Sequence, residues 1–596
     1  MCGVATLYNY HYASPAVDIP ALGVLREELR HRGPDSQDVW VSDDSRIGLV
    51  HTRLSIIGPD ERGRQPMTID DQVVISFNGE IYNYESLRDR YLESSSLQSE
   101  TDTEVVLRLY LLFGVDMLPM LDGMFSLLIW DARRDQLIAA RDGYGVKPLY
   151  YLDNGWAFAA SSEVRALEST GIELTLDPAG LVGFSIFGHV PEPFTSYREV
   201  RSLPPGTYIT VGSLGASEPV EFADISSDLR RLDARDIAAS ENLREALLNS
   251  VRDHLVSDVP VSLFLSSGLD SAALLWAVKQ LNRTEQLTAL TLRFEEYENS
   301  LVDEAVIAGK IAEQSGVRHV PVTWSKADFL NHLPAMIAAM DMPTCDGLNT
   351  WMISRIAADH GFKVALSGIG GDELLGGYPA FRDVPRWKYQ FGLLAHIPML
   401  GRIAENLSGY LPAGLEKAPS LLRYADTTAG AYMVRRGIFM PHELKEFLPM
   451  ELVREGMARL DPLGLMASKT VGFSSVESEV ASLETQCYLR SQLLRDADWA
   501  GMSQGVEIRV PFAYPPLIQR AAPGIDLKGG KAENLLRAGI GLPREVTARS
   551  KTGFTLPMAS WITSGNEHWS RTWVRQIVMK LLDDGSWKRE LELELL

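Results

Sequence analysis

The hydrophobic pattern changes character about a third of the way along the 596-residue chain. Up to about residue 210, short apolar runs alternate with stretches rich in Gly, Asn and Asp, as in the strands of antiparallel sheets. Three such runs are residues 73–77, 125–130 and 137–140. With the turn signal Leu203-Pro204-Pro205-Gly206 near its end, this region predicts a layered, antiparallel β domain.

Beyond this region, apolar runs alternate with helical patterns. Residues 259–265 have the composition of a buried strand, and a helical pattern follows over 271–281. The runs 287–294 and 363–366 lie near further helical segments such as 303–315. Strands that alternate with helices predict a parallel α/β sheet.

The two patterns are separated by an acidic stretch that is poor in long apolar runs, which indicates a linker. From about residue 384 onward the pattern is mostly helical. We therefore expect three parts: a β-rich domain over 1–210, a linker over 211–240, and an α/β domain with a largely helical C-terminal part over 241–596.

Composition narrows the class of protein. The hydrophobic fraction of 45% is that of an ordinary globular protein, and 78 acidic against 57 basic residues give a net charge of −21, which argues against a nucleic-acid partner. We expect no membrane span, since no run of 18 or more apolar residues occurs. Three cysteines cannot form a disulfide framework, and no signal peptide is evident, so we expect a cytoplasmic protein.

The first candidate for chemistry is Cys2. If Met1 is removed, a thiol and a free α-amine share one residue, and an α-amine with a pKa of about 7.7–8.0 can act as general base for its own side chain. Taken alone, a cysteine at the second position is more often an accident of sequence.

Four motifs behind Cys2 change this interpretation. They are 31–35 (His-Arg-Gly-Pro-Asp), 53–56 (Arg-Leu-Ser-Ile), 77–83 (Phe-Asn-Gly-Glu-Ile-Tyr-Asn) and 101–104 (Thr-Asp-Thr-Glu). Together they resemble the glutaminase domain of class II amidotransferases, which use an N-terminal cysteine. The likeness covers about the first 200 residues. It implies an α+β fold of the N-terminal-nucleophile type, in which antiparallel sheets are layered between helices.

The resemblance also implies roles for single residues. Cys2 would be the nucleophile, and the Asn78 side chain and Gly79 N–H would bind the oxyanion. Arg53 would grip the glutamine α-carboxylate, and Asp102 would hold its α-ammonium. Glu80 belongs to the same glutamine site. Taken singly, Arg53 with Asp102 could be a surface ion pair, and Asn78-Gly79 a hairpin turn.

Two Gly-rich and Ser-rich loops, 265–271 and 366–378, follow predicted strands. Neither is a Walker loop, and the first resembles the pyrophosphate loop of enzymes that cleave ATP between the α- and β-phosphates. Asp270 and Asp372, one from each loop, could bind Mg²⁺ together. By resemblance, the ATP site would consist of Leu265, Ser266, Ser267, Gly268, Asp270, Ser271, Ser367 and Gly368.

Three motifs near the C-terminus resemble the asparagine synthetase family: 493–499, 507–512 and 551–554. In that family the lysine of the last motif, here Lys551, meets the phosphates during adenylation. The alternative for a single lysine is an ordinary solvated surface residue. Segments 341–344 and 346–350 occupy the region that lines the acceptor pocket in the family.

The sequence departs from the family at three places. Ser267 replaces a glycine of the pyrophosphate loop, and Ala513-Tyr514 lacks an aspartate that is usual there. Ile369 replaces a glutamate thought to act during amide formation, and an isoleucine cannot accept a proton. This last change puts the identity of the acceptor in doubt but leaves the reaction class intact.

The resemblance implies a glutamine-dependent, ATP-dependent amidotransferase that makes an amide from a carboxylate through an acyl-adenylate. Aspartate is the first acceptor to expect, and the substrates are then glutamine, ATP with Mg²⁺, and this acid. Two alternatives stay open: the same chemistry on another carboxylate, or an inactive synthetase half that serves as a binding module. The family also suggests a homodimer.

Overall fold

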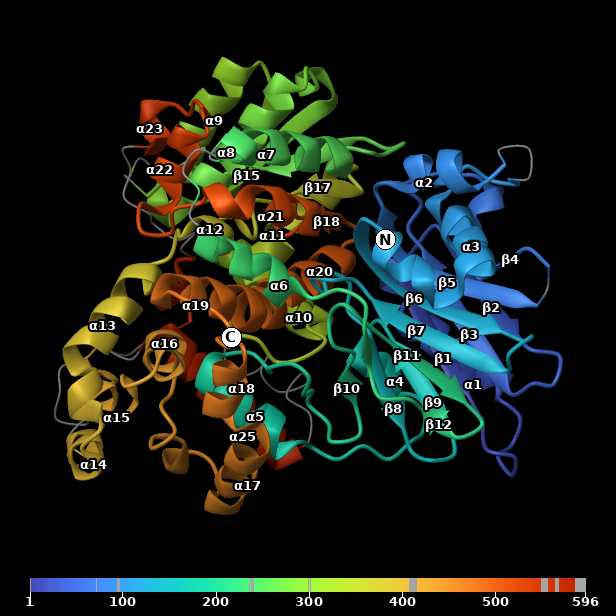
Figure 1. Ribbon diagram of the computed structural model, residues 1–596, viewed down its shortest axis with the longest axis horizontal. Coiled ribbons are helices and arrows are strands. Elements are labelled where there is room, and N and C mark those ends of the chain that lie inside the picture. The colour runs from blue at the N-terminus through green and yellow to red at the C-terminus, as the bar shows by residue number, and fades with distance from the viewer. Residues whose placement is uncertain are drawn as a thin grey trace.

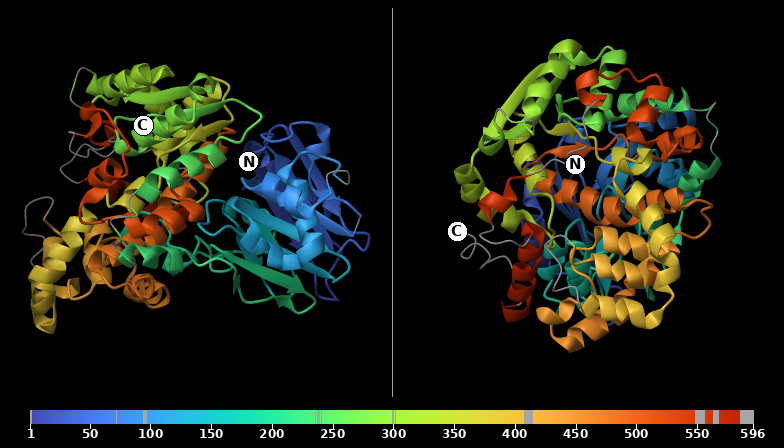
Figure 2. Two further views of the ribbon diagram at one scale, coloured as in Figure 1. Left: turned by 45° about the horizontal axis from the view of Figure 1, so that its top comes forward. Right: turned by 90° about the vertical axis from the view of Figure 1, so that its left-hand side faces the viewer.

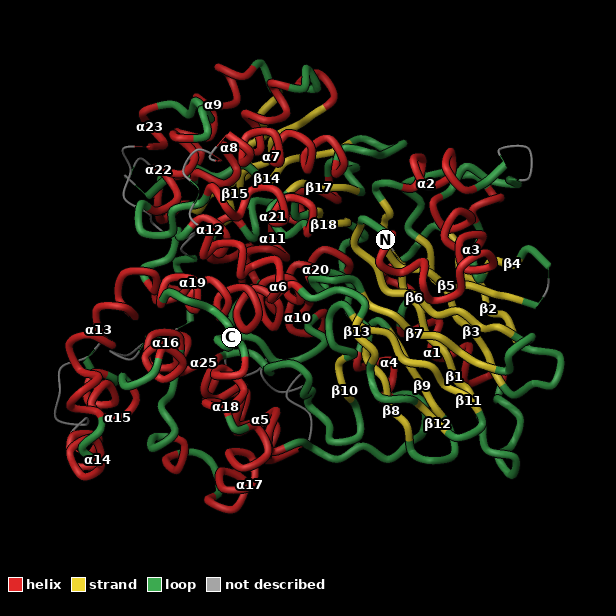
Figure 3. The backbone as a smooth tube through the Cα atoms, viewed as in Figure 1, coloured by secondary structure: helices red, strands yellow, loops and turns green. Residues whose placement is uncertain are grey.

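The computed structural model describes residues 2–584, with gaps at 71, 94–96, 235, 237–238, 240, 299, 301, 407–414, 548–555 and 563–567. Figure 1 shows the N-terminal strands gathered on one side of the molecule and most helices on the other. Figure 3, in which the backbone tube is coloured by secondary structure, shows the same separation of strands from helices. Among the helices of these residues, none is long and apolar enough to cross a membrane.

The N-terminal domain contains two antiparallel sheets. The first has the strand order β10-β8-β9-β1-β3-β2, and the second is β12-β11-β7-β6-β5-β4 with β13 paired to β11. The strands of the first sheet are β1 (Cys2–Tyr8), β2 (Ser36–Val41), β3 (Ile47–Arg53), β8 (Tyr150–Asp153), β9 (Phe158–Ser161) and β10 (Arg201–Ser202). Those of the second are β4 (Met67–Thr68), β5 (Val73–Ile81), β6 (Gly123–Asp131), β7 (Gln136–Arg141), β11 (Thr207–Gly212), β12 (Gly215–Ala216) and β13 (Val220–Glu221).

The two sheets stack face to face, with β1 against β5 and β6. Helices α1 (Ile19–Glu28) and α4 (Val164–Glu168) pack on the first sheet, and α3 (Asp102–Phe113), beside α2 (Tyr84–Tyr91), packs on the second. The central strands are therefore covered on both faces, which explains why β5 and β6 are buried almost throughout. The predicted α+β fold with layered antiparallel sheets is confirmed.

The end of this domain lies further along than expected. The expected boundary at 210 falls inside β11, and the 211–240 stretch contains β12, β13 and the helix α6 (Ile225–Arg230). These short strands are formed by Gly, Ala, Val and Glu without an apolar alternation. The hydrophobic pattern therefore missed them.

The second domain is built on a five-stranded parallel sheet in the order β16-β15-β14-β17-β18. Because the order turns at β14, the crevice beyond the carboxyl ends of β14 and β17 is the expected ligand position in such a sheet. The strands are β14 (Val261–Phe264), β15 (Leu287–Phe294), β16 (Arg318–Trp324), β17 (Val364–Leu366) and β18 (Glu507–Arg509).

Helices cover this sheet and continue beyond it (Figure 2). Helices α8 and α9 connect successive strands of this sheet, and α10 and α11 lie between β16 and β17 in the chain. The sheet-associated helices are α7 (Glu241–His254), α8 (Leu269–Gln280), α9 (Glu304–Ser315), α10 (Lys326–Ala339), α11 (Leu348–Asp359), α12 (Gly371–Leu375), α20 (Arg495–Met502) and α21 (Pro515–Ala521).

The C-terminal part is largely helical, as the pattern predicts. A π-helical segment, Glu484–Leu494, lies between α19 and α20. The helix α5 (Pro178–Phe187) of the N-terminal part packs against α17 and α25. The remaining helices are α13 (Ala380–Ala395), α14 (Pro398–Asn406), α15 (Leu421–Tyr424), α16 (Thr428–Arg436), α17 (Met450–Leu460), α18 (Pro462–Ser468), α19 (Val476–Leu483), α22 (Gly530–Arg537), α23 (Arg544–Thr547), α24 (Met558–Trp561) and α25 (Trp569–Asp584).

Candidate functional site

Strand pairing fixes the position of Cys2. Cys2 lies directly opposite Arg53 in the β1–β3 register. Its backbone nitrogen donates to Asn78 Oδ1 at 3.0 Å, and its carbonyl oxygen accepts from Arg32 Nε at 3.1 Å. Both sheets therefore hold the residue, and burial raises the pKa of its thiol.

Five of the six residues predicted for the glutaminase site line one small cavity of about 20 Å³: Cys2, Arg53, Gly79, Glu80 and Asp102. Asn78 holds Cys2 from beside this cavity. A Cβ on Gly79 would lie 2.2 Å from the carbonyl oxygen of Met124. Only glycine therefore allows β5 to approach β6 this closely at the nucleophile.

Two charged residues of this cavity, Arg53 and Asp102, are held by backbone groups. Arg53 donates to the carbonyl oxygens of Asp60 at 2.9 Å and Gly58 at 2.6 Å. Asp102 accepts from the N–H groups of Ile81 at 3.0 Å and Thr103 at 2.8 Å. Burial nevertheless raises the pKa of Asp102 to about 6, so its charge is set to change near neutral pH.

Buried ion pairs join the two domains. Arg32, which is fully buried, contacts Glu163 at 2.9 Å and Asp498 at 2.7 Å. Asp498 belongs to the motif at 493–499. Because an unpaired buried charge is costly, these pairs tie the cysteine strand to α20 of the second domain.

A second link runs through the 507–512 motif. Arg509 lies 3.6 Å from Glu80 of the cysteine cavity and 2.5 Å from Glu507. The carbonyl oxygen of Arg509 accepts from Ser367 N at 2.8 Å. The edge strand β18 thus contacts the cysteine cavity through the Arg509 side chain. Through its backbone it also contacts the loop at 366–378, the second nucleotide loop.

The first nucleotide loop ends at the N-terminus of α8. Gly268 is the N-cap residue and has no side chain, so the first N–H groups of α8 remain available to an anion. Ser266 Oγ and Ser271 Oγ lie 3.0 Å apart across the loop. The two loops pack so closely that a Cβ on Gly371 would lie 2.1 Å from Asp270 Oδ1.

Both loops line a cavity of about 400 Å³ between β14 and β17, where the strand order of the sheet reverses. Apolar residues such as Leu290 and Ile353 form part of its wall. Of the residues predicted for ATP, it is lined by Leu265, Ser266, Asp270, Ser271, Ser367 and Gly368. Ser267 and Gly268 complete the loop outside that lining.

Asp270 and Asp372 come together at this cavity, as expected, but a lysine lies between them. Lys531 Nζ is 2.5 Å from Asp270 Oδ2 and also contacts Asp372 Oδ1. Burial lowers the pKa of Lys531, but the two carboxylates outweigh burial and hold it above its usual value. The site therefore favours positive charge.

Two carboxylates in the lining of this cavity suit Mg²⁺, which keeps water and phosphate oxygens as its other ligands. Within the described residues no cluster of three or more His, Cys, Asp or Glu side chains could hold a metal by itself. The residues thus fit a magnesium ion that arrives with a nucleotide. Lys551, the lysine predicted for the phosphates, lies outside the described residues.

Three further residues of the predicted pattern have clear positions. Ile369 lines the nucleotide cavity. Glu373, which lines the same cavity, is buried, accepts from Tyr378 Oη at 2.9 Å, and has a pKa that burial raises to about 8. Asp341 belongs to the segment expected to line the acceptor pocket. Its carboxylate accepts hydrogen bonds from the N–H groups of Val164 at 2.9 Å and Arg165 at 3.0 Å.

Comparison with known families agrees with this two-site arrangement. Residues 1–220 match the glutamine amidotransferase domain, and residues 242–592 match asparagine synthase. The chain belongs to the asparagine synthase family. As a member of this family, the protein is a glutamine-hydrolysing carbon–nitrogen ligase that uses ATP.

Its relatives extend over most of the chain. Asparagine synthetase (glutamine-hydrolyzing) 1 of Bacillus subtilis is 29% identical, over 100% of this chain and 93% of the relative. A putative asparagine synthetase (glutamine-hydrolyzing) of Mycobacterium bovis is 31% identical, over 90% of this chain and 84% of its own length. Amidase chry2 of Gibberella zeae is 31% identical, over 64% of this chain and 60% of its own length.

Sequence reasoning missed two parts of this asparagine synthase site. Lys531 follows a Gly-Gly pair at the start of a short helix, and no motif marks it. The Glu373–Tyr378 hydrogen bond lies inside the second loop, but the sequence alone gives no sign that Glu373 is buried. The pairing of Arg32 with Asp498 joins two recognised motifs that are 466 residues apart.

Proposed function

We propose that this protein transfers the amide nitrogen of glutamine to a carboxylate, which it first activates as an acyl-adenylate. The observation that carries the proposal is the pairing of two sites through buried contacts. The cysteine cavity reaches β18 through Glu80, and β18 holds the second nucleotide loop through Arg509 and Ser367.

In the first half-reaction, the Cys2 thiolate attacks the side-chain carbonyl carbon of glutamine and ammonia leaves. Water then hydrolyses the thioester to glutamate and free thiol. Once Met1 is removed, the Cys2 nitrogen is an amine that can take the thiol proton, and Asn78 Oδ1 holds that nitrogen at 3.0 Å. The Asn78 amide and the Gly79 N–H are the candidate oxyanion donors.

Ammonia must then reach the second site without passing through bulk water, where it would be protonated. Buried polar atoms lie at the contacts that join the two domains. Arg32 Nη2, Glu80 Oε2 and Tyr82 Oη are buried and have no hydrogen-bond partner among the described residues. Buried polar atoms of this kind suit a small molecule that both donates and accepts hydrogen bonds.

In the second half-reaction, a carboxylate oxygen attacks the α-phosphorus of ATP and pyrophosphate leaves. Ammonia then attacks the acyl carbon, a proton is lost, and AMP leaves as the amide forms. The N-terminus of α8 and the Lys531 ammonium would receive the pyrophosphate charge. Mg²⁺, held by Asp270 and Asp372, would neutralise phosphate charge when bound.

The experiment measures pyrophosphate and AMP formation from ATP with a carboxylate and either glutamine or ammonium. L-aspartate is the first acceptor to test, because the synthetase relatives carry asparagine in their names. Amide, AMP and pyrophosphate formed in equal amounts support the proposal. If no carboxylate stimulates pyrophosphate release while glutamine is still hydrolysed, the synthetase half is a binding module instead.

A further inference from the structure

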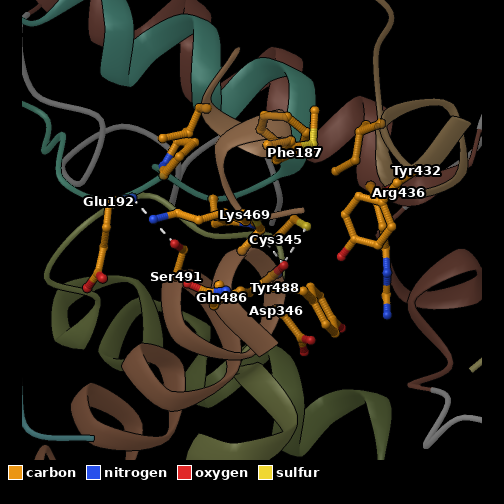
Figure 4. Close-up of a pocket in the computed structure, with 18 of the residues that line it drawn as sticks. Phe187, Glu192, Cys345, Asp346, Tyr432, Arg436, Lys469, Gln486, Tyr488 and Ser491 are labelled. Atoms are coloured by element: carbon orange, nitrogen blue, oxygen red, sulfur yellow. Dashed lines mark hydrogen bonds between the residues drawn. The ribbon is translucent and has the colours of Figure 1, made fainter. Parts of the chain in front are cut away.

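A second cavity of about 360 Å³ adjoins the nucleotide cavity. The two share Asp346, Asn349 and Tyr488 in their walls, so these three residues mark the junction where the cavities adjoin. Figure 4 shows Asp346 and Tyr488 on one side of the second cavity and Phe187 on the opposite side. The position is that of a substrate whose reacting end must meet ATP.

Elements far apart in the sequence build this second cavity. Phe187 comes from the end of α5, while Gln486, Cys487 and Tyr488 come from the π-helical segment. A π-helix widens the backbone turn and is frequent at functional sites. The cavity is therefore a formed feature of the fold and lies between the two parts of the chain.

The wall of this cavity is predominantly apolar. Its apolar side chains come from several elements and include Phe187, Ile438, Leu465, Met466, Leu556 and Trp569. Binding sites of about 300–1,000 Å³ typically hold ligands much larger than a single polar amino acid. A ligand with apolar groups would remove this wall from water and gain binding free energy in proportion to the buried area.

Two charged groups of the wall, Arg436 and Glu192, are already engaged with the protein, and Lys469 adds a further cation. Arg436 donates to Glu484 through Nε at 3.1 Å and Nη2 at 2.5 Å, and its guanidinium lies over the rings of Tyr378 and Tyr488. Glu192 is paired with Arg141 at 2.8 Å.

Aspartate would need a cation for its α-carboxylate in this cavity. Taking Arg436 from Glu484 would leave a buried carboxylate without its partner, which is strongly unfavourable. His189 offers no substitute, because burial lowers its pKa to about 3 and keeps the ring neutral. Lys469 is the remaining cation among the described residues of this lining. The wall thus offers a small dipolar acid little beyond Lys469, whereas its predominantly apolar surface suits an apolar body well.

We propose that the acceptor is a carboxylic acid with an extended apolar body, aromatic or aliphatic, rather than aspartate. The body occupies the second cavity, and the carboxylate lies at the junction formed by Asp346, Asn349 and Tyr488. Ile369, on the nucleotide side of this junction, is consistent with such an acid because it adds no charged group. This inference rests on the proposed acyl-adenylate chemistry.

The test is pyrophosphate release from ATP by the full-length protein with ammonium chloride as nitrogen source. The acceptors are L-aspartate, a straight-chain series from propanoate to octanoate, and 3-phenylpropanoate. We expect aspartate to be the poorest, and KM to fall about four-fold for each added CH₂ until the cavity is full.

Release stimulated by aspartate alone would overturn this inference while leaving the proposed function standing. Release stimulated by none of the acids, in protein that still hydrolyses glutamine, would overturn both. Flat KM values along the straight-chain series would also contradict the inference, because an apolar wall must respond to chain length.

A matched pair of variants on α18 locates the binding site. Leu465 lines the cavity, whereas Leu463 is a half-buried leucine of the same helix outside the lining. We expect Leu465→Trp to raise KM for the best apolar acid about ten-fold or more, since the indole fills its space. Leu463→Trp should leave that KM and the KM for ATP unchanged. Equal effects of both variants on the acid would overturn the assignment of this cavity.

Discussion

Replacing Lys531 with methionine tests the electrostatics of the nucleotide site. The change keeps the length of the side chain and removes a charge that contacts both Asp270 and Asp372. Breaking a buried ion pair costs about 3–5 kcal/mol. The two carboxylates are 17% and 16% exposed, and water screens part of their repulsion, so we expect a loss of about 2–4 kcal/mol in unfolding free energy.

A double-mutant cycle separates this charge effect from lost packing. In the Lys531→Met background, Asp372→Asn removes the repulsion between the carboxylates. The double variant should therefore lose less stability than the two single variants together, by about 1–2 kcal/mol. Equilibrium urea unfolding, followed by tryptophan fluorescence without Mg²⁺ or nucleotide, measures each unfolding free energy. Losses that add within about 0.5 kcal/mol would refute the reasoning.

The same variant has a catalytic consequence. If the Lys531 ammonium receives phosphate charge, Lys531→Met should lower the rate of pyrophosphate release about 10²–10³-fold. Hydrolysis of glutamine without acceptor should continue, because Lys531 lies in the other half of the enzyme. A normal rate of pyrophosphate release would show that this lysine only balances the two carboxylates.

Three further predictions concern single side chains. Cys2→Ala should abolish glutamine use but leave synthesis from ammonium, and loss of both activities at saturating ammonium would contradict the division of labour. Protonation of Asp102 near pH 6 removes the charge proposed to hold the glutamine α-ammonium, so KM for glutamine should rise about ten-fold per pH unit below 6; an Asp102→Asn variant with the same pH profile would refute this. Glu373 retains its proton to about pH 8 when folded, against an ordinary value of 4.5. Unfolding free energy should therefore fall by about 1.4 kcal/mol per pH unit as the pH rises through that window, and Glu373→Gln should flatten the profile.

The fold could be predicted from the sequence wherever apolar runs were long. The strands β5, β6 and β15 lie where the runs at 73–77, 125–130 and 287–294 indicate them, because each is covered on both faces. The short strands β12 and β13 could not be found this way. They are held by backbone pairing to β11, which leaves no hydrophobic signature.

The candidate site could be predicted as far as its motifs reach. Cys2 and Arg53 lie opposite each other because their strands pair in that register, and no pattern in the sequence states the register. Lys531 could not be predicted, since its significance depends on two carboxylates more than 150 residues away. The second cavity could not be predicted either, because it is formed by packing between α5 and the C-terminal helices.

The central claim is that nitrogen passes inside the protein from the Cys2 site to the nucleotide site. The most direct measurement supplies glutamine labelled with ¹⁵N in its side-chain amide, together with unlabelled ammonium, ATP and the best acceptor. Mass spectrometry then reads the isotope in the amide product. Transfer within the protein predicts a product that retains most of the ¹⁵N despite excess unlabelled ammonium. A product whose label follows the isotope ratio of the bulk ammonium would contradict it.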